Sequence, residues 1–378
     1  MERKMKNRFV FSAAFLAVLP WMPLAAQGQI DQAQALPALQ TGAAALSQGF
    51  NASRIGSPDP AALPGSLTFD VVVSDKSGAP VSGLQAEEFK LLDNSQPQSL
   101  VSFEAASGGS AKVDSPTEVV LVLDAINSSP YAVGKDRLWL DKYFSQNGGQ
   151  LALPTSIVLL TDLKAKAQSP PTRDAKVLKS FLAAHPTGWR SIQRGTGFWG
   201  AVDRRNLSLD SLHLIASSLA KRPGRKLVIW ISPGWAPMSG QVPYMSAKEK
   251  QILFNYIASV STDLRKARIT LCSVNSNLQW VDSLYYETFL KGAAGPKDAD
   301  HGDLMLQVLA YQTGGKVLVD DNDLSSLVER CVADAKASYV LTFNPPPAAH
   351  PNEYHEIKVV LDKPGLTART RTGYYTQP

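Results

Sequence analysis

The segment from Glu118 to Ser129 constrains the fold more than any other part of the chain. It reads E-V-V-L-V-L-D-A-I-N-S-S, an almost unbroken aliphatic run that ends in an acid and small polar residues. A strand that is apolar on both faces has to be buried on both faces, as the strands of parallel sheets are. Open α/β sheets bind ligands just past the carboxyl ends of such strands. The segment therefore predicts a buried strand that brings Asp124, Asn127 and Ser128 to a candidate binding site.

Further apolar runs of strand length follow, and segments with helical periodicity separate them. The runs are Ser156 to Leu160, Leu227 to Ile231, Ile269 to Val274 and the shorter Lys316 to Val319. Strands that alternate with helices predict a doubly wound, mainly parallel α/β sheet with helices on both faces. We assign this predicted domain to residues 115–337.

Short strands of a different kind flank the predicted α/β domain. Residues 66–106 and 338–376 contain short apolar stretches separated by Gly, Pro and Asn, a pattern typical of antiparallel β structure. Neither segment has enough strands for a stable unit of its own. The simplest interpretation is one small antiparallel β-sandwich that the two segments form together, with the α/β domain inserted between them.

The first residues resemble an export signal. Residues 1–26 contain a basic stretch, a short apolar core and small residues after it, which predicts a cleaved signal peptide and an exported protein, periplasmic or extracellular. An uncleaved membrane anchor is the alternative. No second apolar stretch is long enough to cross a bilayer, so no stable span is expected after cleavage. Residues 27–65 are rich in Ala, Gln, Pro and Ser, which is typical of a flexible lead-in.

Net charge argues against nucleic acid as a partner. The chain carries +5, of which +3 lies in the first 26 residues. The remaining +2 is too small for binding to polyanions. The sequence also lacks zinc spacing, a nucleophile elbow and a phosphate-binding or dinucleotide-binding glycine motif, so we expect no enzymatic activity.

Four sequence fragments together resemble a known family. They are E-E-F-K-L-L-D-N-S-Q-P-Q-S-L-V-S-F from Glu87 to Phe103, L-D-A-I-N from Leu123 to Asn127, T-G-G from Thr313 to Gly315 and R-T-G-Y-Y from Arg371 to Tyr375. The combination resembles the von Willebrand factor A-type domain and, more closely, the acidobacterial-type VWFA-related secreted family. The resemblance covers Leu67 to Thr376 and implies a VWA-like fold.

The resemblance also implies a divalent cation site, which this sequence retains only in part. A-type domains hold the cation with Asp-x-Ser-x-Ser, a separate Thr and a separate Asp. Asp124, Ser128 and Thr196 match three of these positions, whereas Ile126 and Pro233 stand where the middle Ser and the second Asp belong. A hard cation with one protein carboxylate binds weakly. We therefore interpret the metal site as degenerate, with Asp124 capping the following loop. A weakly bound Mg²⁺ or Mn²⁺ is the alternative.

Two tryptophans and two cysteines complete the candidate residues. Trp199 and Trp235 lie in segments expected near the strand ends, where aromatic side chains suit a protein-binding surface. Burial between loops and sheet is the other interpretation of both. Cys272 and Cys331 lie in apolar surroundings, and either a disulfide or two buried thiols fits the sequence.

Taken together, these features predict an exported, non-enzymatic protein without a required cofactor. It would bind a protein or a cell-envelope polymer through the strand ends of the α/β domain, around Asp124, Asn127, Ser128, Thr196, Trp199 and Trp235. A metal-dependent adhesion domain, a secreted hydrolase and a purely structural envelope component are the alternatives.

Overall fold

The computed structural model describes most of the chain after residue 64. The chain divides into two compact units, Met1–Pro37 and Ala38–Pro378, and every described residue belongs to the second. The predicted signal peptide, nearly all of the predicted lead-in and Thr196 lie outside the described residues. These are 65–105, 117–187, 197–235, 245–276, 285–320, 323–336 and 338–376.

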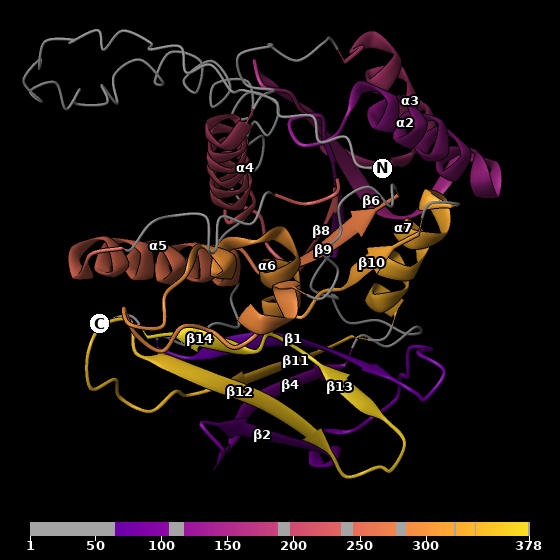
Figure 1. Cartoon of the computed structure of the whole chain (residues 1–378). Helices are drawn as coiled ribbons and strands as arrows, with labels where there is room; N and C mark the ends of the chain where they lie inside the picture. The colour runs from indigo at the N-terminus through magenta and orange to yellow at the C-terminus, as the bar shows by residue number, and fades with distance from the viewer. Residues whose placement is uncertain are drawn as a thin grey trace, which may run out of the picture. The chain divides into compact units, whose positions relative to one another are not determined.

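A six-stranded sheet forms the centre of the α/β part, in the order β10-β9-β8-β5-β6-β7. Figure 1 labels four of its strands, β6, β8, β9 and β10. Neighbouring strands are parallel except β7, which is antiparallel to β6. Strand β5 lies between β6 and β8, and all of its residues are buried. The prediction of a buried central strand is confirmed. The bounds are β5 Glu118–Asp124, β6 Gln150–Leu160, β7 Ala165–Asp174, β8 Lys226–Ile231, β9 Ile269–Asn275 and β10 Val317–Val319.

Helices cover both faces of this sheet, as predicted (Figure 1). Side chains of β5 alternate between the faces, so Val120 and Val122 pack in one hydrophobic core while Leu121 and Leu123 pack in the other. The first core contains side chains of α4, α5 and α6, and the second contains those of α2, α3 and α7. The bounds are α2 Pro130–Ser145, α3 Ala175–Ala184, α4 Gly197–Leu219, α5 Ala247–Lys266, α6 Leu306–Gln312 and α7 Leu324–Val332.

Strand β7 is the element that the sequence pattern does not predict. Its sequence, A-K-A-Q-S-P-P-T-R-D, has no apolar alternation and contains two prolines. It lies at the edge of the sheet, where one side of the backbone needs no partner and proline is tolerated. An edge strand without a buried face leaves no hydrophobic signal in the sequence.

Two four-stranded sheets pack face to face and form a β-sandwich below the central domain (Figure 1). Strands from both flanking segments mix in each sheet: β1 pairs with β11, and β2 pairs with β12. The shared core holds Phe69, Leu91, Tyr339 and Ile357. The sheet orders are β13-β1-β11-β4 and β14-β12-β2-β3. The bounds are β1 Leu67–Ser74, β2 Phe89–Asp93, β3 Gln96–Gln98, β4 Leu100–Ala105, β11 Ser338–Phe343, β12 Tyr354–Leu361, β13 Thr367–Arg369 and β14 Gly373–Tyr375.

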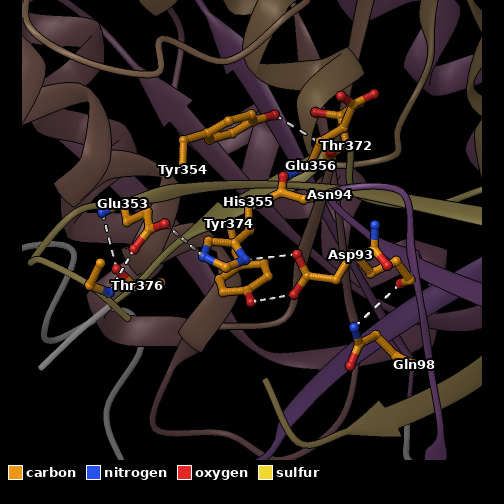
Figure 2. A network of polar contacts seen from close by, with 12 residues as sticks. Asp93, Asn94, Gln98, Glu353, Tyr354, His355, Glu356, Thr372, Tyr374 and Thr376 are labelled. Carbon is orange, nitrogen blue, oxygen red and sulfur yellow. Dashed lines mark hydrogen bonds and ion pairs between the residues drawn. The ribbon is translucent and has the colours of Figure 1, made fainter. Parts of the chain in front are cut away.

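A buried carboxylate ties three strands of the sandwich together (Figure 2). Asp93, at the end of β2, accepts a hydrogen bond of 2.7 Å from the Tyr374 hydroxyl on β14. Its other oxygen lies 2.7 Å from Nδ1 of His355 on β12. The second ring nitrogen of His355 lies 3.7 Å from a Glu353 carboxylate oxygen. Since Asp93, His355 and Tyr374 are all buried, this network is part of the packed sandwich core.

Two of the motif fragments meet at the junction between the central domain and the sandwich. The backbone N–H of Thr372, within R-T-G-Y-Y, donates to the carbonyl of Gln312, which precedes T-G-G, at 3.1 Å. The two tyrosines of the second motif point to opposite sides of β14. Tyr374 lies in the sandwich core, whereas Tyr375 lies in the core of the central domain and donates to the Ala293 carbonyl at 3.0 Å. One strand therefore contributes to both cores.

Candidate functional site

The candidate site lies at the carboxyl ends of the central strands. We call it the strand-tip face, and it consists of the described residues that follow β5, β6, β8 and β9. Parallel strands bring these ends to one edge of the sheet. The residues are 124–131, 161–164, 232–235 and 275–276.

Asp124 lies at the centre of this face, and its carboxylate is fully buried. One oxygen accepts the backbone N–H groups of Ile126 at 2.9 Å and Asn127 at 3.1 Å. The other accepts Nδ2 of Asn127 at 2.8 Å and the indole N–H of Trp230 at 2.9 Å. A carboxylate offers about four lone-pair sites, and these donors fill them. The geometry matches the capping interpretation of Asp124, and a cation would have to displace one of these donors.

The sheet explains why Asp124 faces inward. Side chains alternate along β5, so Asp124 points to the same side as Val122, which is paired in register with Trp230 on β8. Trp230 is fully buried in that core and needs an acceptor for its indole N–H. The acid at the end of the apolar run supplies this acceptor.

Asn127 links the end of β5 to helix α4. Its Nδ2 group donates to Asp124 and also to the Ser208 hydroxyl at 2.8 Å, so both amide hydrogens are used. Ser208 in turn donates to the Arg204 carbonyl, one helical turn earlier, at 2.9 Å. Asn127 therefore orients the loop after β5 against α4.

Two further positions of the predicted metal site, Ser128 and Ile126, lie in the loop between β5 and α2. Ser128 is 2 % exposed, Ile126 is equally buried, and Thr196 lies outside the described residues. The next residue, Ser129, caps helix α2 and accepts the N–H of Ala132 at 3.1 Å. No group of three or more His, Cys, Asp or Glu side chains among the described residues could hold a metal ion.

The two candidate tryptophans differ sharply in exposure. Trp235 is 2 % exposed and packs edge-on against Trp230, with ring centroids 5.4 Å apart. Trp199 is 73 % exposed in the first turn of α4, beside Phe198. A partner can therefore contact Trp199 directly, whereas Trp235 supports the face from within, as the burial interpretation predicts.

Two exposed apolar residues of the strand-tip face were not among the sequence candidates. Tyr131 is 81 % exposed in the first turn of α2, directly after the β5 loop. Leu163 is 65 % exposed in the turn between β6 and β7. Because β5 and β6 are neighbours, both side chains lie at the same edge of the sheet. A large apolar residue beside a helix cap, as in S-P-Y, is the only sequence signal for Tyr131.

A second buried acid lies close to the strand ends. Asp136 on α2 accepts a hydrogen bond from the Ser276 hydroxyl just after β9, and Lys135 donates to the Ser276 carbonyl at 3.1 Å. Burial raises the pKa of Asp136 to about 6, although the Ser276 hydrogen bond opposes the shift. Perturbed acids of this kind occur at functional sites and in packed ones alike.

The raised pKa of Asp136 predicts that the free energy of unfolding depends on pH. Its pKa in the folded chain lies above its ordinary value of 3.8, so the folded chain holds the proton more tightly and loses stability as pH rises from 3.8 to about 6. The loss is about 3 kcal/mol from this group. Asp136→Asn does not titrate, so its stability relative to the parent chain should rise over this interval. Urea unfolding of both chains from pH 4 to pH 7.5 checks this, and a difference that stays flat with pH would refute it.

Cys272 on β9 and Cys331 on α7 lie in the same hydrophobic core as free, fully buried thiols. A hydrogen bond between the two thiols lowers the pKa of Cys272, and the same bond raises that of Cys331. The sequence allows either a disulfide or two free thiols, and the structure has two free thiols whose sulfur atoms are neighbours.

Within the described part of the chain, none of the helices combines the length and the apolar character that crossing a bilayer demands.

Comparison with known proteins adds little to the geometry. No family model matches the sequence, and no curated protein matches it. Among solved structures, the human COPII-coat protein Sec24c is similar with a TM-score of 0.33 and 9 % identity, over 70 % of this chain and 44 % of that one. The chain thus spans less than half of Sec24c.

Two further structures match over nearly their full length. Manganese-loaded Plasmodium vivax TRAP protein matches with a TM-score of 0.32 and 10 % identity, over 75 % of this chain and 97 % of that one. The SpRpn10 VWA domain matches with a TM-score of 0.30 and 13 % identity, over 58 % and 97 %. Scores this low assign neither a family nor a function. The strand order and the contacts described above establish a mainly parallel six-stranded sheet between two layers of helices, the architecture that the resemblance to A-type domains predicts.

Proposed function

We propose that this chain is a non-enzymatic binding protein that recognises a protein or a surface polymer through its strand-tip face, without a metal ion. The arrangement of Asp124 carries the metal-independent part of this proposal. Its four acceptor positions hold the loop after β5 and the Trp230 ring, so the carboxylate serves the fold. A partner's acid then has no bound cation to coordinate.

Exposed apolar side chains support the recognition part. Tyr131 and Leu163 lie on the strand-tip face and Trp199 lies in the first turn of α4, and each is more than half exposed. Aromatic residues are enriched in the central regions of protein interfaces, where they bury large areas at low entropic cost. The half-buried Asn127 links the loop after β5 to α4, and the buried Trp235 packs against Trp230.

We also propose that the protein is exported, because its first residues have the composition of a signal peptide. In this proposal the α/β domain is an insertion in the sandwich, since the sandwich strands lie on either side of it in the sequence. An exported chain of this kind would meet its partner in the cell envelope or outside the cell.

A peptide-display selection tests the proposed face. The full chain is immobilised and a random peptide library is selected on it, and the enriched peptides are then measured against two triple variants. Tyr131→Ser, Leu163→Ser and Trp199→Ser together should weaken binding at least tenfold. Leu138→Ser, Ile252→Ser and Val177→Ser, which change exposed apolar residues elsewhere, should leave it unchanged. Both sets change surface positions, so folding should be little affected.

Chelation separates the proposal from its metal-dependent rival. Binding to the selected peptides should be equal with EDTA and with millimolar Mg²⁺ or Mn²⁺. Loss of binding in EDTA, or equal loss in both triple variants, would reject a metal-free strand-tip face.

A further inference from the structure

A small cavity lies at the junction of the sandwich and the central domain, opposite in the fold to the strand-tip face. Its walls come from β1, from the carboxyl end of α5 with the start of β9, from Thr313 after α6 and from Arg371 before β14. Its volume is about 20 Å³, which is space for a water molecule or one small ion. Three arginines line it together with a single acid: Arg265, Arg268, Arg371 and Asp70.

Among the residues that the structure describes, only one of these arginines has a carboxylate partner at the cavity. Arg268 forms an ion pair with Asp70, with 2.7 Å between Nη2 and Oδ1. Arg371 is 6 % exposed, and its one hydrogen bond among the described residues is a long one, 3.4 Å from Nη1 to the Ser261 carbonyl. The Nε group of Arg265 is buried and has no hydrogen-bond partner among the described residues.

The charges around the cavity therefore do not balance. Three guanidinium groups face one carboxylate, which leaves an excess of two positive charges in a mostly buried place. Burial, together with the neighbouring Arg265, lowers the pKa of Arg371 to about 9. A buried cation without a counter-charge is costly, and the low local dielectric strengthens its attraction for an anion.

We propose that this cavity binds one small inorganic anion of the size of chloride, held by Arg265 and Arg371. The guanidinium N–H groups that lack good protein acceptors supply the donors, and a volume of about 20 Å³ suits a monatomic ion. The ion neutralises part of the excess charge between α5 and the strands β1 and β14, which belong to different sheets of the sandwich. It therefore links the sandwich to the central domain, and its binding stabilises the folded chain by mass action.

A salt titration at constant ionic strength tests this site. The melting temperature of the full chain is measured while sodium gluconate is replaced stepwise by sodium chloride or sodium bromide. The parent chain should show a saturable rise with either halide. Arg371→Gln and Arg265→Gln should each lose that rise. Arg205→Gln changes a partly buried arginine of α4 that does not line the cavity, so it should keep the rise.

Asp70→Asn should change the halide affinity in the direction opposite to that of the two arginine variants. Removing the one negative charge of the cavity should increase the halide affinity severalfold, even though the ion pair with Arg268 is lost. Crystals grown in bromide should show an anomalous peak within hydrogen-bond distance of the Arg371 guanidinium. Equal melting curves in gluconate and halide, saturation by phosphate but not by halide, or a missing bromide peak would each overturn the proposal. The strand-tip face is not involved, so these outcomes are independent of the peptide-binding test.

Discussion

Replacing Asp124 with alanine is expected to lower the free energy of unfolding by about 3–5 kcal/mol, enough to leave little soluble protein. The substitution removes the acceptor of four hydrogen bonds at a fully buried position. It leaves the indole N–H of Trp230 and two backbone N–H groups buried without a partner. Urea unfolding followed by tryptophan fluorescence measures the loss. Asp124→Asn should be intermediate, because the amide can accept on only one side.

Asp174→Ala is the matched control for this variant. Asp174 is an exposed acid that caps α3 and accepts the N–H of Lys176 at 2.9 Å. Its removal should cost about 1 kcal/mol, as a lost cap usually does. Isothermal titration of the parent chain with Mg²⁺ and Mn²⁺ completes the experiment. If Asp124→Ala is as stable as the control, the capping role of Asp124 is wrong. If the parent chain binds Mn²⁺ saturably and Asp124→Asn does not, Asp124 is a metal ligand.

Replacing Gly315 with alanine is expected to cost at least about 4 kcal/mol, at the upper end for a single substitution. A Cβ atom at this position would lie 1.8 Å from the carbonyl oxygen of Leu271, on the backbone of β9. The atoms that this Cβ would meet belong to the backbone and not to a flexible side chain. The backbone of β9 or of the T-G-G turn would therefore have to move. Thr313 in the same turn accepts the N–H of Leu271 at 3.0 Å, so the movement would also break this bond.

Gly295→Ala provides the comparison. This variant also replaces a glycine with alanine and so lowers the conformational entropy of the unfolded chain by the same amount. A Cβ atom at position 295, however, meets nothing within 4 Å. Thermal unfolding of the two variants side by side isolates the steric effect. A difference of less than about 1 kcal/mol between them would show that the close approach of Gly315 to β9 is not a constraint.

Much of the central fold could be predicted from the sequence because it rests on burial. Strand β5 is aliphatic on both faces, and only a sheet with two helical layers buries such a strand. Strand β7 could not be predicted, since an exposed edge strand needs no apolar pattern. The sandwich was predictable as a type of structure, but the pairing of β1 with β11 depends on contacts between residues that are far apart in the sequence.

The candidate site was predictable in position more than in detail. Asp124 does stand at the end of the central strand, and the alternation along β5 already implies an inward side chain. The exposure of the tryptophans could not be predicted, because loop residues have no periodicity that reveals which side is buried. Asp136 shows the same limit: in the sequence K-D-R it has the look of a surface acid, and only the position of Ser276 shows that it is buried.

The adjacent residues Tyr374 and Tyr375 have a consequence for how this chain can be shortened. The ring of Tyr375 packs against Phe254 of α5, with centroids 5.9 Å apart, while its neighbour packs among the aromatic rings of the sandwich. A truncated chain that ends before β11 would keep every strand of the central sheet and still lack one of the large side chains that fill its core. Researchers who wish to isolate the α/β part must therefore supply a substitute for that ring, since deleting the sandwich leaves a hole in the part that remains.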